Sequence, residues 1–431
     1  MGMYFGTDGI RGEYGSFITP SLAFKCGCSL ASLCHNQKVL IARDTRTTGD
    51  ILTLSVANGL MSCGIDVVDI GITPTPVVSF LTEKLGCDFG IVISASHNPP
   101  SHNGIKIFDG LGYKITEEEE NKIENFFSFS QYVQFDKVGH YQFKPTLINL
   151  YKKKVLLNCT IKNKLKIVID CANGATFSLA KKIFPVFCRE VVFIADNNDG
   201  ANINQNCGAL HPENLAKHIA IHNANLGFSF DGDGDRIIMC DKNGRTFDGD
   251  DILCLLSSTL SKEEKYVVGT TMTNKGLEEY LTSKNITLLR SDVGDKYVSE
   301  VMKNRNISLG GEPSGHIIMK KFSKTGDAIG TACAVLQILS IENFSTNEIV
   351  TFKKYPQINK NIEVKDKFRI LNSDLFKQKI ADFQEKLKGE GRILVRASGT
   401  ESKIRIMCEC LDEVLAGKIV QEIESIILQI K

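Results

Sequence analysis

Ser96 and its neighbours have the residue types and the spacing that nucleophilic chemistry needs. The apolar β-branched run Ile91–Ile93 predicts a buried strand, and small polar residues follow it up to Asn98. The double proline at 99–100 then excludes regular structure. A hydroxyl at the end of a buried strand, beside the imidazole of His97, is well placed to act as a nucleophile. An ordinary strand-to-loop exit with a polar cap is an equally good interpretation of this stretch taken alone.

A second group of residues could bind a metal ion. Asp231, Asp233 and Asp235 alternate with glycines and come directly after an apolar run. Carboxylate oxygens at this spacing can surround one hard cation, and oxygen ligands of this kind suit Mg²⁺. A calcium loop of the EF-hand type would need glycine where Arg236 stands, so we expect one Mg²⁺ ion. A polar turn rich in Asp and Gly is the alternative, but three uncompensated carboxylates would repel each other.

A third group, near the end of the chain, could hold a phosphate. It follows the apolar run 393–395 and combines hydroxyls, a glycine and flanking arginines. Such residues form a suitable cradle for phosphate oxygens. An ordinary hairpin turn is the alternative interpretation. The residues concerned are Arg396, Ser398, Gly399, Thr400 and Arg405.

A fourth group could bind a sugar. Glu312, Ser314 and His316 place a carboxylate, a hydroxyl and an imidazole on one tight loop, which can bind several sugar hydroxyls at once. The signal is weak alone, because turns often contain Gly, Pro and Ser. Two further stretches, 7–12 and 43–46, carry arginines that could neutralise a phosphate near the nucleophilic serine. Neither of these two stretches indicates a function without the other motifs.

The elements that must position these groups alternate along the chain. Strand-like apolar runs and longer segments of helical period follow one another, which predicts α/β domains with mixed, mostly parallel sheets. In such sheets functional residues gather in loops beyond the carboxyl ends of strands. The pattern changes near the end and predicts a smaller α+β domain. We expect three similar α/β domains, at 1–150, 151–248 and 249–358, and an α+β domain at 359–431.

Individual elements can also be predicted from apolar runs and periodicity. The expected strands include Lys38–Ala42, Val67–Ile70, Gly90–Ile93, Leu165–Asp170, Leu226–Phe230, Tyr266–Gly269, Ile362–Val364, Arg392–Val395 and Lys403–Cys408. The expected helices include Asp50–Gly59, Asp374–Leu387 and Leu411–Lys431.

Composition excludes several classes of partner. The chain of 431 residues has a net charge of +1, which gives no general attraction for nucleic acid or for an anionic membrane. The start of the chain has neither the basic nor the apolar region of a signal peptide, and no apolar run approaches the ~18–20 residues of a membrane span. The 14 cysteines are scattered and lack a C-x-x-C motif. We expect buried thiols in a reducing compartment, and hence a cytoplasmic protein.

The motifs together resemble those of a known family. FGTDGIRG, ISASHNP, DGDGDR, GEPSGH and RASGTES, in this order, are similar to the motifs of the α-D-phosphohexomutase family over the whole chain. The resemblance implies four domains around a central cleft, Mg²⁺ dependence and a phosphorylated serine. Within the family the chain most resembles members that interconvert glucosamine 6-phosphate and glucosamine 1-phosphate. Pro313 stands where these members commonly carry Gln, so mannose or glucose phosphates stay open as alternative substrates.

The resemblance also implies roles for single residues. Ser96 would be the phosphoserine, and its phosphate would bind Mg²⁺ together with the three aspartates of the metal motif. Arg11 and Arg236 would stabilise the transferring phosphoryl group, and His97 and Lys106 are acid/base candidates. The sugar ligands would be Glu312, Ser314 and His316. The ligands of the distal phosphate would be Arg396, Ser398, Gly399, Thr400 and Arg405.

The implied partners are small molecules. They are a phosphorylated hexose or hexosamine as substrate and a hexose 1,6-bisphosphate as activator. The resemblance implies a monomer or homodimer that binds neither nucleic acid nor membrane. Two other classes remain possible from the residues: an aspartyl-phosphate hydrolase with Asp231 as nucleophile, and a non-catalytic protein that binds sugar phosphates.

Overall fold

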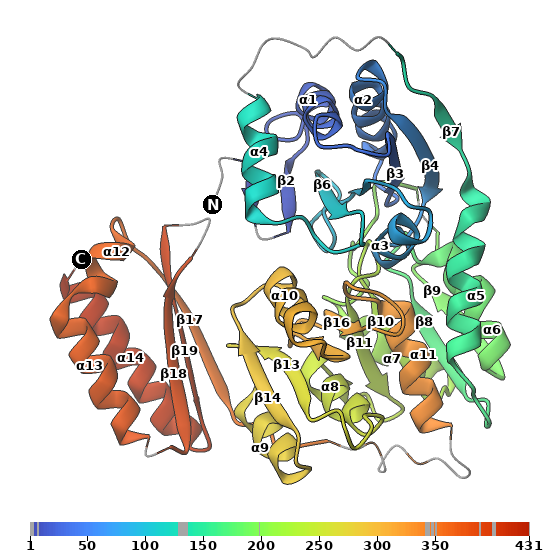
Figure 1. Ribbon diagram of the computed structural model, residues 1–431. Helices are drawn as coiled ribbons and strands as arrows, with labels where there is room; N and C mark the ends of the chain where they lie inside the picture. The colour runs from blue at the N-terminus through green and yellow to red at the C-terminus, as the bar shows by residue number, and fades with distance from the viewer. Residues whose placement is uncertain are drawn as a thin grey trace. The chain divides into compact units, whose positions relative to one another are not determined.

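The computed structural model describes residues 4–6, 8–127, 137–197, 199–340, 345, 349, 351–387, 389–398 and 402–430. These residues form two compact units. The first unit lies within Met1–Thr270 and Ile286–Thr351, and the second lies within Thr271–Asn285 and Phe352–Lys431. The helices and strands of each unit are coloured along the chain in Figure 1.

The first sheet of the first unit carries the expected nucleophile. Its strands are β1 (Phe5–Gly6), β2 (Gly9–Glu13), β3 (Lys38–Arg43), β4 (Asp66–Ile72), β5 (Phe89–Ile93), β6 (His102–Asp109) and β7 (Tyr141–Phe143). They are ordered β1-β2-β6-β5-β3-β4-β7, with β5, β3, β4 and β7 parallel and β6, β2 and β1 joined by antiparallel pairing. The accompanying helices are α1 (Pro20–Ala31), α2 (Gly49–Ser62), α3 (Thr75–Lys84), α4 (Glu117–Phe127), the 3₁₀ turn η1 (Pro145–Leu147) and α5 (Ile148–Asn158).

Two glycines allow α1 and α2 to lie side by side over this sheet (Figure 1). A Cβ atom on Gly27 would lie 2.2 Å from the carbonyl oxygen of Val56, and one on Gly59 would lie 2.2 Å from that of Phe24. Any side chain at either position would push the helices apart. The close contact buries apolar side chains of both helices against the strands, which stabilises the sheet that holds the nucleophile loop.

Two further sheets complete the first unit. The second sheet contains β8 (Lys166–Asp170), β9 (Glu190–Ile194), β10 (Leu226–Phe230), β11 (Ile237–Asp241) and β12 (Thr246–Phe247), in the order β12-β11-β10-β8-β9. The third contains β13 (Tyr266–Thr270), β14 (Thr287–Ser291), β15 (Leu309–Gly311) and β16 (Ile317–Met319), in the order β14-β13-β15-β16. Their helices are α6 (Phe177–Phe187), α7 (Pro212–His222), α8 (Gly249–Ser257), α10 (Asp295–Arg305) and α11 (Ala328–Leu339).

Each motif loop of the first unit joins two antiparallel strands. The nucleophile loop lies between β5 and β6, and the metal loop lies between β10 and β11. The sugar loop lies between β15 and β16. In each case the first strand of the pair also has a parallel neighbour. The sequence predicted the first strands β5 and β10, because apolar residues dominate them, and it did not predict β6. The mixed α/β sheets that were expected are confirmed.

The second unit is built on an antiparallel sheet. Its strands are β17 (Gln357–Glu363), β18 (Gly391–Ala397) and β19 (Lys403–Cys410), in the order β17-β19-β18. Its helices are α9 (Lys275–Ser283), α12 (Lys367–Asn372), α13 (Asp374–Lys386) and α14 (Glu413–Ile430). α13 and α14 lie together on one face of the sheet (Figure 1) and bury an apolar core against it. The expected α+β architecture of this part is confirmed.

Residues 271–285 belong to this second unit through a buried carboxylate. Glu409, fully buried on β19, accepts hydrogen bonds from the backbone N–H of Lys275 at 2.7 Å and from Nε of Arg392 at 3.2 Å. Arg392 also donates to the carbonyl oxygens of Thr271 and Thr273, both at 2.6 Å. The start of α9 is thereby tied to the C-terminal sheet. The four expected domain boundaries remain predictions.

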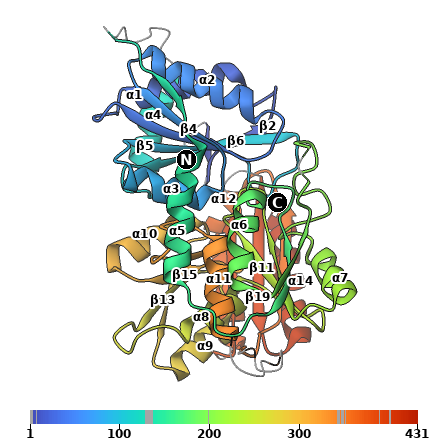
Figure 2. The ribbon, with the colours of Figure 1, turned by 90° about the vertical axis from the view of Figure 1, so that its right-hand side faces the viewer.

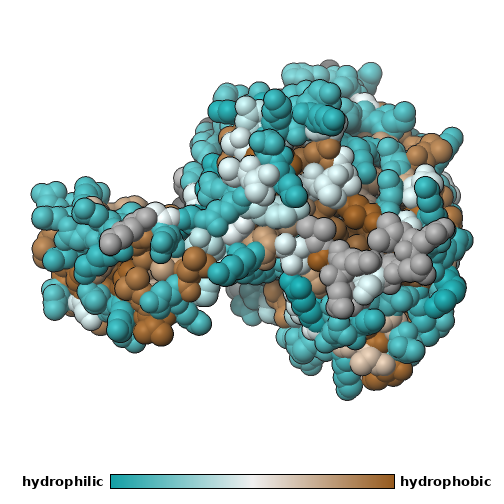
Figure 3. Space-filling model, turned by 90° about the horizontal axis from the view of Figure 1, so that it is seen from below, coloured by the Kyte–Doolittle hydropathy of each residue, from teal (hydrophilic) through white to brown (hydrophobic). Residues whose placement is uncertain are grey.

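The surface and the thiols agree with the composition. Hydrophilic residues cover most of the face shown in Figure 3, with apolar residues in smaller patches between them. No helix within the described ranges combines the length and the apolar character that a membrane span needs. All 14 cysteines are free, and all but Cys34 are buried, as predicted.

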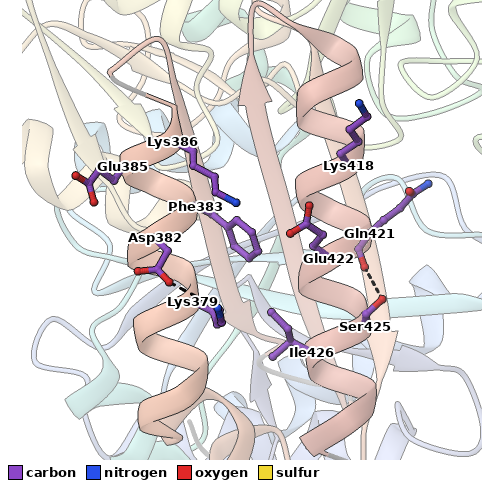
Figure 4. Close-up of a pocket in the computed structure, with 10 residues that line it drawn as sticks. All are labelled: Lys379, Asp382, Phe383, Glu385, Lys386, Lys418, Gln421, Glu422, Ser425 and Ile426. Carbon is purple, nitrogen blue, oxygen red and sulfur yellow. Dashed lines mark hydrogen bonds and ion pairs between the residues drawn. The ribbon is translucent and has the colours of Figure 1, made fainter.

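A groove of about 1020 Å³ lies between α13 and α14 (Figure 4). Its floor includes Phe383, and its walls carry both lysines and carboxylates, such as the Lys379–Asp382 pair at 3.8 Å. None of its described lining residues belongs to the sequence motifs. The groove is therefore a surface feature of the helical layer, and the chemistry has to be sought in the loops.

Helix α5 is fixed by a buried hydrogen bond to the N-terminus of α11. The hydroxyl of Tyr151 donates to Oδ2 of Asp327 at 2.5 Å, while Oδ1 of Asp327 accepts from the N–H of Gly330 at 2.8 Å. The ring of Tyr151 also contacts Phe80 of α3, with centroids 6.0 Å apart, and α3 and α5 can be followed in Figure 2. Burial raises the pKa of Asp327 to about 6, although the hydrogen bonds and Lys154 oppose this shift.

The raised pKa of Asp327 predicts a pH-dependent effect on stability. The folded protein binds the proton of the Asp327 carboxyl more tightly than the unfolded chain does. The protonated side chain therefore stabilises the folded protein below about pH 4, and this stabilisation is lost as pH rises through about 6. Asp327→Asn mimics the protonated side chain. Relative to wild type, it should gain about 2–3 kcal/mol of stability between pH 4 and pH 7. Urea unfolding at both pH values measures this gain, and the exposed Asp374→Asn serves as control. An equal effect of Asp327→Asn at both pH values would contradict the assignment.

Candidate active site

Ser96 lies in the loop between β5 and β6, with its side chain fully buried. Its Oγ donates a hydrogen bond to Oδ2 of Asp231 at 2.5 Å. Its backbone N–H donates to Oγ of Ser94 at 2.9 Å, and its φ of +52° lies in the left-handed region. Nδ1 of His97 lies 3.4 Å from the Ser96 hydroxyl. The structure thus places the expected nucleophile against the first carboxylate of the metal motif.

The three aspartates of the metal motif lie between β10 and β11 and are buried. Asp231, Asp233 and Asp235 offer carboxylate oxygens within 4.8 Å of one another. Thr75 donates to Oδ2 of Asp233 at 2.5 Å, but Oδ1 of Asp233 and Oδ1 of Asp235 have no hydrogen-bond partner among the described residues. Buried oxygens of this kind are costly unless a cation or water satisfies them. The donor set therefore fits a hard cation such as Mg²⁺.

Lys106, on β6, supplies positive charge to this cluster. Its Nζ lies 2.6 Å from Oδ2 of Asp233 and 2.6 Å from Oδ2 of Asp235. Burial alone would lower the pKa of Lys106, but Asp233, Asp235 and Asp8 raise it above its usual value. Burial and the two neighbouring carboxylates raise the pKa of Asp231 well above its usual range. Against the effect of burial, Lys106 holds the pKa of Asp235 well below that range. Lys106 is therefore held as an ammonium ion.

His97 is surrounded by cationic groups and is held neutral. Burial, with the positive charges of Arg236 and Arg11, lowers the pKa of His97 to about 4. Nε of Arg236 lies 4.0 Å from Oδ1 of Asp235, and the guanidinium of Arg11 forms an ion pair with Asp8. At neutral pH the imidazole is thus uncharged. The two arginines that were expected near the phosphoryl group do lie in the first unit with Ser96.

The sugar loop is connected to the metal loop through His316. In the turn between β15 and β16, the backbone N–H of Glu312 donates to the carbonyl oxygen of His316 at 3.0 Å. Nε2 of His316 lies 3.1 Å from Oδ2 of Asp295, and its Nδ1 lies 3.7 Å from Oδ1 of Asp235. Glu312 and His316 are buried, whereas Ser314 at the tip of the turn is exposed. The loop therefore combines a buried imidazole, which lies between two carboxylates, with an accessible hydroxyl.

The expected phosphate ligands lie in the second unit. Arg396 on β18 stands opposite Arg405 on β19, and Nη2 of Arg405 lies 3.5 Å from Oγ of Ser398. The N–H of Ser398 donates to the carbonyl oxygen of Lys403 at 2.8 Å. Two arginines and a hydroxyl are thus gathered at one end of a β-hairpin. Gly399 and Thr400, which were also expected to bind phosphate, lie outside the described residues.

Three charged residues that the sequence did not single out as ligands complete the cluster in the first unit. Nζ of Lys114 forms ion pairs with both Asp8 and Asp295. Because Asp295 also faces His316, a chain of alternating charges runs from the opening motif to the sugar loop. In the sequence, only their position within segments that resemble the family could have drawn attention to Asp8 and Asp295. Lys114 carries no motif of its own.

The chain matches all four domains of one protein family. Residues 2–132 match the alpha/beta/alpha domain I of the phosphoglucomutase/phosphomannomutase family, and residues 146–244 match domain II. Residues 248–355 match domain III, and residues 360–426 match the C-terminal domain. Every motif described above falls inside one of these matches.

Relatives are similar over the full length. A phosphoglucosamine mutase of Carboxydothermus hydrogenoformans is 38% identical over 441 residues, covering 99% of this chain and 99% of the relative. A phosphoglucosamine mutase of Campylobacter fetus is 39% identical over 444 residues, covering 99% of this chain and 98% of the relative. A phosphoglucomutase/phosphomannomutase family protein of Burkholderia thailandensis has the same fold, with a TM-score of 0.83 at 23% identity over 98% of this chain and 97% of that one. Site and relatives define a phosphohexomutase, an isomerase that transfers phosphoryl groups. The chain belongs to the phosphoglucomutase/phosphomannomutase family.

Removing one carboxylate should remove the cation site. Asp231→Asn leaves the volume of the side chain almost unchanged but removes a negative charge, so the affinity for Mg²⁺ should fall at least about tenfold. The measurement is the rise in melting temperature as MgCl₂ is added. Asp241→Asn, at the end of the neighbouring strand β11, is the matched control and should respond to Mg²⁺ like wild type. An unchanged response in Asp231→Asn would exclude this carboxylate as a ligand.

Proposed function

We propose that the chain interconverts glucosamine 6-phosphate and glucosamine 1-phosphate through a phosphorylated Ser96. The observation that carries the reaction is the buried contact of Ser96 Oγ with Asp231 inside the carboxylate cluster. The observation that supports the sugar is the name of the full-length relatives, which are phosphoglucosamine mutases. The free, mostly buried cysteines support a reducing, cytoplasmic location.

The reaction has two phosphoryl transfers. In the first, the bond between phosphorus and Oγ of phospho-Ser96 breaks, a bond from phosphorus to a free sugar hydroxyl forms, and the proton of that hydroxyl goes to a base. The product is a bisphosphorylated sugar. In the second, Oγ of Ser96 takes the other phosphoryl group, and the proton returns to the oxygen that this group leaves. A hexose 1,6-bisphosphate would supply the first phosphate to Ser96.

The chain's own groups have distinct tasks in this scheme. A Mg²⁺ ion held by the three aspartates and a phosphate oxygen on Ser96 would neutralise charge on the transferring group. Arg11 and Arg236 would bind the phosphoryl oxygens, and the ammonium of Lys106 would hold two carboxylates in place. His97, whose Nδ1 lies 3.4 Å from Oγ of Ser96, and Lys106 are the groups that we propose as acid/base candidates.

Recognition of the rest of the substrate falls to two further loops. Glu312, Ser314 and His316 would bind sugar hydroxyls, because they offer a carboxylate, a hydroxyl and an imidazole on one turn. Residues of the β18–β19 hairpin would bind the phosphate that is not being transferred, because paired arginines favour planar, bidentate contacts with phosphate. The residues proposed for this second task are Arg396, Ser398, Gly399, Thr400 and Arg405.

Replacement of the nucleophile tests the reaction. Ser96→Ala should lower kcat at least about 1,000-fold, because no other group can carry the phosphate. Ser101→Ala, which alters an exposed serine of the same loop, is the control. Turnover of glucosamine 6-phosphate is measured after incubation with glucose 1,6-bisphosphate, and peptide mapping locates the phosphate.

Full activity of Ser96→Ala, or an acyl phosphate on Asp231, would refute the scheme. A preference for mannose or glucose phosphates over glucosamine phosphates would refute only the proposed sugar.

Replacement of a phosphate ligand tests the second loop. Arg405→Met should raise KM for the sugar monophosphate about tenfold or more, because a charge-assisted contact is lost. Lys377→Met removes an exposed charge from α13 in the same unit and should leave KM unchanged. Steady-state kinetics on both variants provides the comparison. Equal KM values would show that Arg405 takes no part in binding.

A further inference from the structure

Arg46 is buried beneath the nucleophile loop, and every N–H of its guanidinium is used. Its side chain has no exposed surface. Nε donates to Oδ2 of Asp44 at 2.9 Å. Nη1 donates to the carbonyl oxygens of Pro99 and, at 2.8 Å, of His102. Nη2 donates to the carbonyl oxygens of Ser96 at 3.0 Å and Asn98 at 2.8 Å. A guanidinium has five N–H donors, and here all five have protein acceptors.

This arrangement answers a question that the sequence left open. The stretch 43–46 carries arginines that could neutralise a phosphate near Ser96, but it indicated no function on its own. Arg46 has no N–H left for a phosphate and no exposed surface from which to reach one. Its charge is matched instead by Asp44 and by four backbone carbonyl dipoles of one loop.

The same loop is held from two other sides. Nδ2 of Asn204 donates to the carbonyl oxygens of Ser96 at 2.8 Å and Asn98 at 3.2 Å. Oδ2 of Asp44 accepts a hydrogen bond from Oγ of Ser94 at 2.6 Å, and that hydroxyl accepts the N–H of Ser96. The backbone of Ser96 is thus fixed at its N–H through Asp44 and Ser94, and at its carbonyl by Arg46 and Asn204.

Such restraint is needed because of the backbone conformation of Ser96. Its φ of +52° is unfavourable for a residue with a side chain, by roughly 1–2 kcal/mol. Without restraint the residue would relax to negative φ, and Oγ would turn away from Asp231. The direction of Oγ therefore depends on the groups that hold the carbonyl and the N–H of residue 96.

We propose that Arg46 is a positioning residue that keeps Ser96 in its left-handed conformation by binding the carbonyl oxygens of Ser96, Asn98, Pro99 and His102. The proposal rests on the proposed function, in which Ser96 carries the phosphate. It assigns to Arg46 no contact with the substrate. The fork-shaped guanidinium is required, since a lysine ammonium has three donors and cannot bind four carbonyls and a carboxylate together.

The test compares Arg46→Lys with Arg43→Lys, three residues earlier on the same chain. Arg43 is a matched control because its guanidinium pairs with Asp50 and Asp69 and not with the loop. Arg46→Lys should lower kcat and the rate of Ser96 phosphorylation by glucose 1,6-bisphosphate about 100-fold, as expected for a misplaced nucleophile. KM for the sugar phosphate should change less than about twofold, because binding groups are untouched. Arg43→Lys should behave like wild type.

A second measurement reports on the loop without activity. Hydrogen exchange of the peptide covering residues 94–104 should be faster in Arg46→Lys than in Arg43→Lys, while exchange in β10 stays as in wild type. In Arg46→Ala, added guanidinium chloride at millimolar concentration should restore part of kcat. If Arg46→Lys does not fold, Asn204→Gly provides the test, because it removes another donor to the same carbonyls and tolerates positive φ. It should lower kcat with KM unchanged.

The outcomes separate this proposal from the proposed function. If wild type shows no phosphate on Ser96 and no mutase activity, the proposed function fails, whatever the exchange data show. If wild type is active and Arg46→Lys or Asn204→Gly keeps wild-type kcat and loop exchange, the positioning role is wrong. A loss that appears mainly in KM would instead identify Arg46 as a binding residue and would also overturn the proposal.

Discussion

The buried negative charge of Asp231, Asp233 and Asp235 is the constraint on which the first unit depends. Three carboxylates that lie within 4.8 Å of one another cannot all stay ionised in a buried position unless cations face them. Lys106 supplies one such charge, and it stands on β6, in a different sheet from the metal loop. The charge requirement therefore also holds two sheets together. Any change that moves β6 would leave the carboxylates uncompensated.

The same local topology presents the nucleophile, metal and sugar loops of the first unit. A strand with a parallel neighbour turns back into an antiparallel strand, and the turn carries the functional side chains. The returning strand matters as much as the first one. β6 delivers Lys106 to the metal loop, and β16 follows directly after His316, which faces Asp235. A hairpin attached to a parallel sheet thus supplies a loop and a second side chain from one rigid element.

The sequence predicted what depends on local pattern and missed what depends on pairing. β5 and β10 were expected because apolar residues dominate both runs, and the metal loop was expected because aspartates at alternate positions suit one cation. β6 contains Asn103, Gly104 and Lys106, whose polarity hides the strand. Lys106 is buried there only because carboxylates distant in sequence surround it. The role of Arg46 could not be predicted for a similar reason, since exposed and backbone-bound arginines look alike in a sequence.

The conformation of Ser96 shows how a strained residue can be stable. The left-handed backbone costs roughly 1–2 kcal/mol, and one hydrogen bond from a charged donor contributes about 1.5–3 kcal/mol. The carbonyl of Ser96 receives one such bond from Arg46 and a second hydrogen bond from the neutral amide of Asn204, so the cost is offset locally. Because Arg46 is itself held by Asp44, and Asp44 also binds Ser94, the two sides of residue 96 share one buried anchor. A nucleophile aimed in this way needs no rearrangement before it reacts, which is the property that phosphoryl transfer by positioning requires.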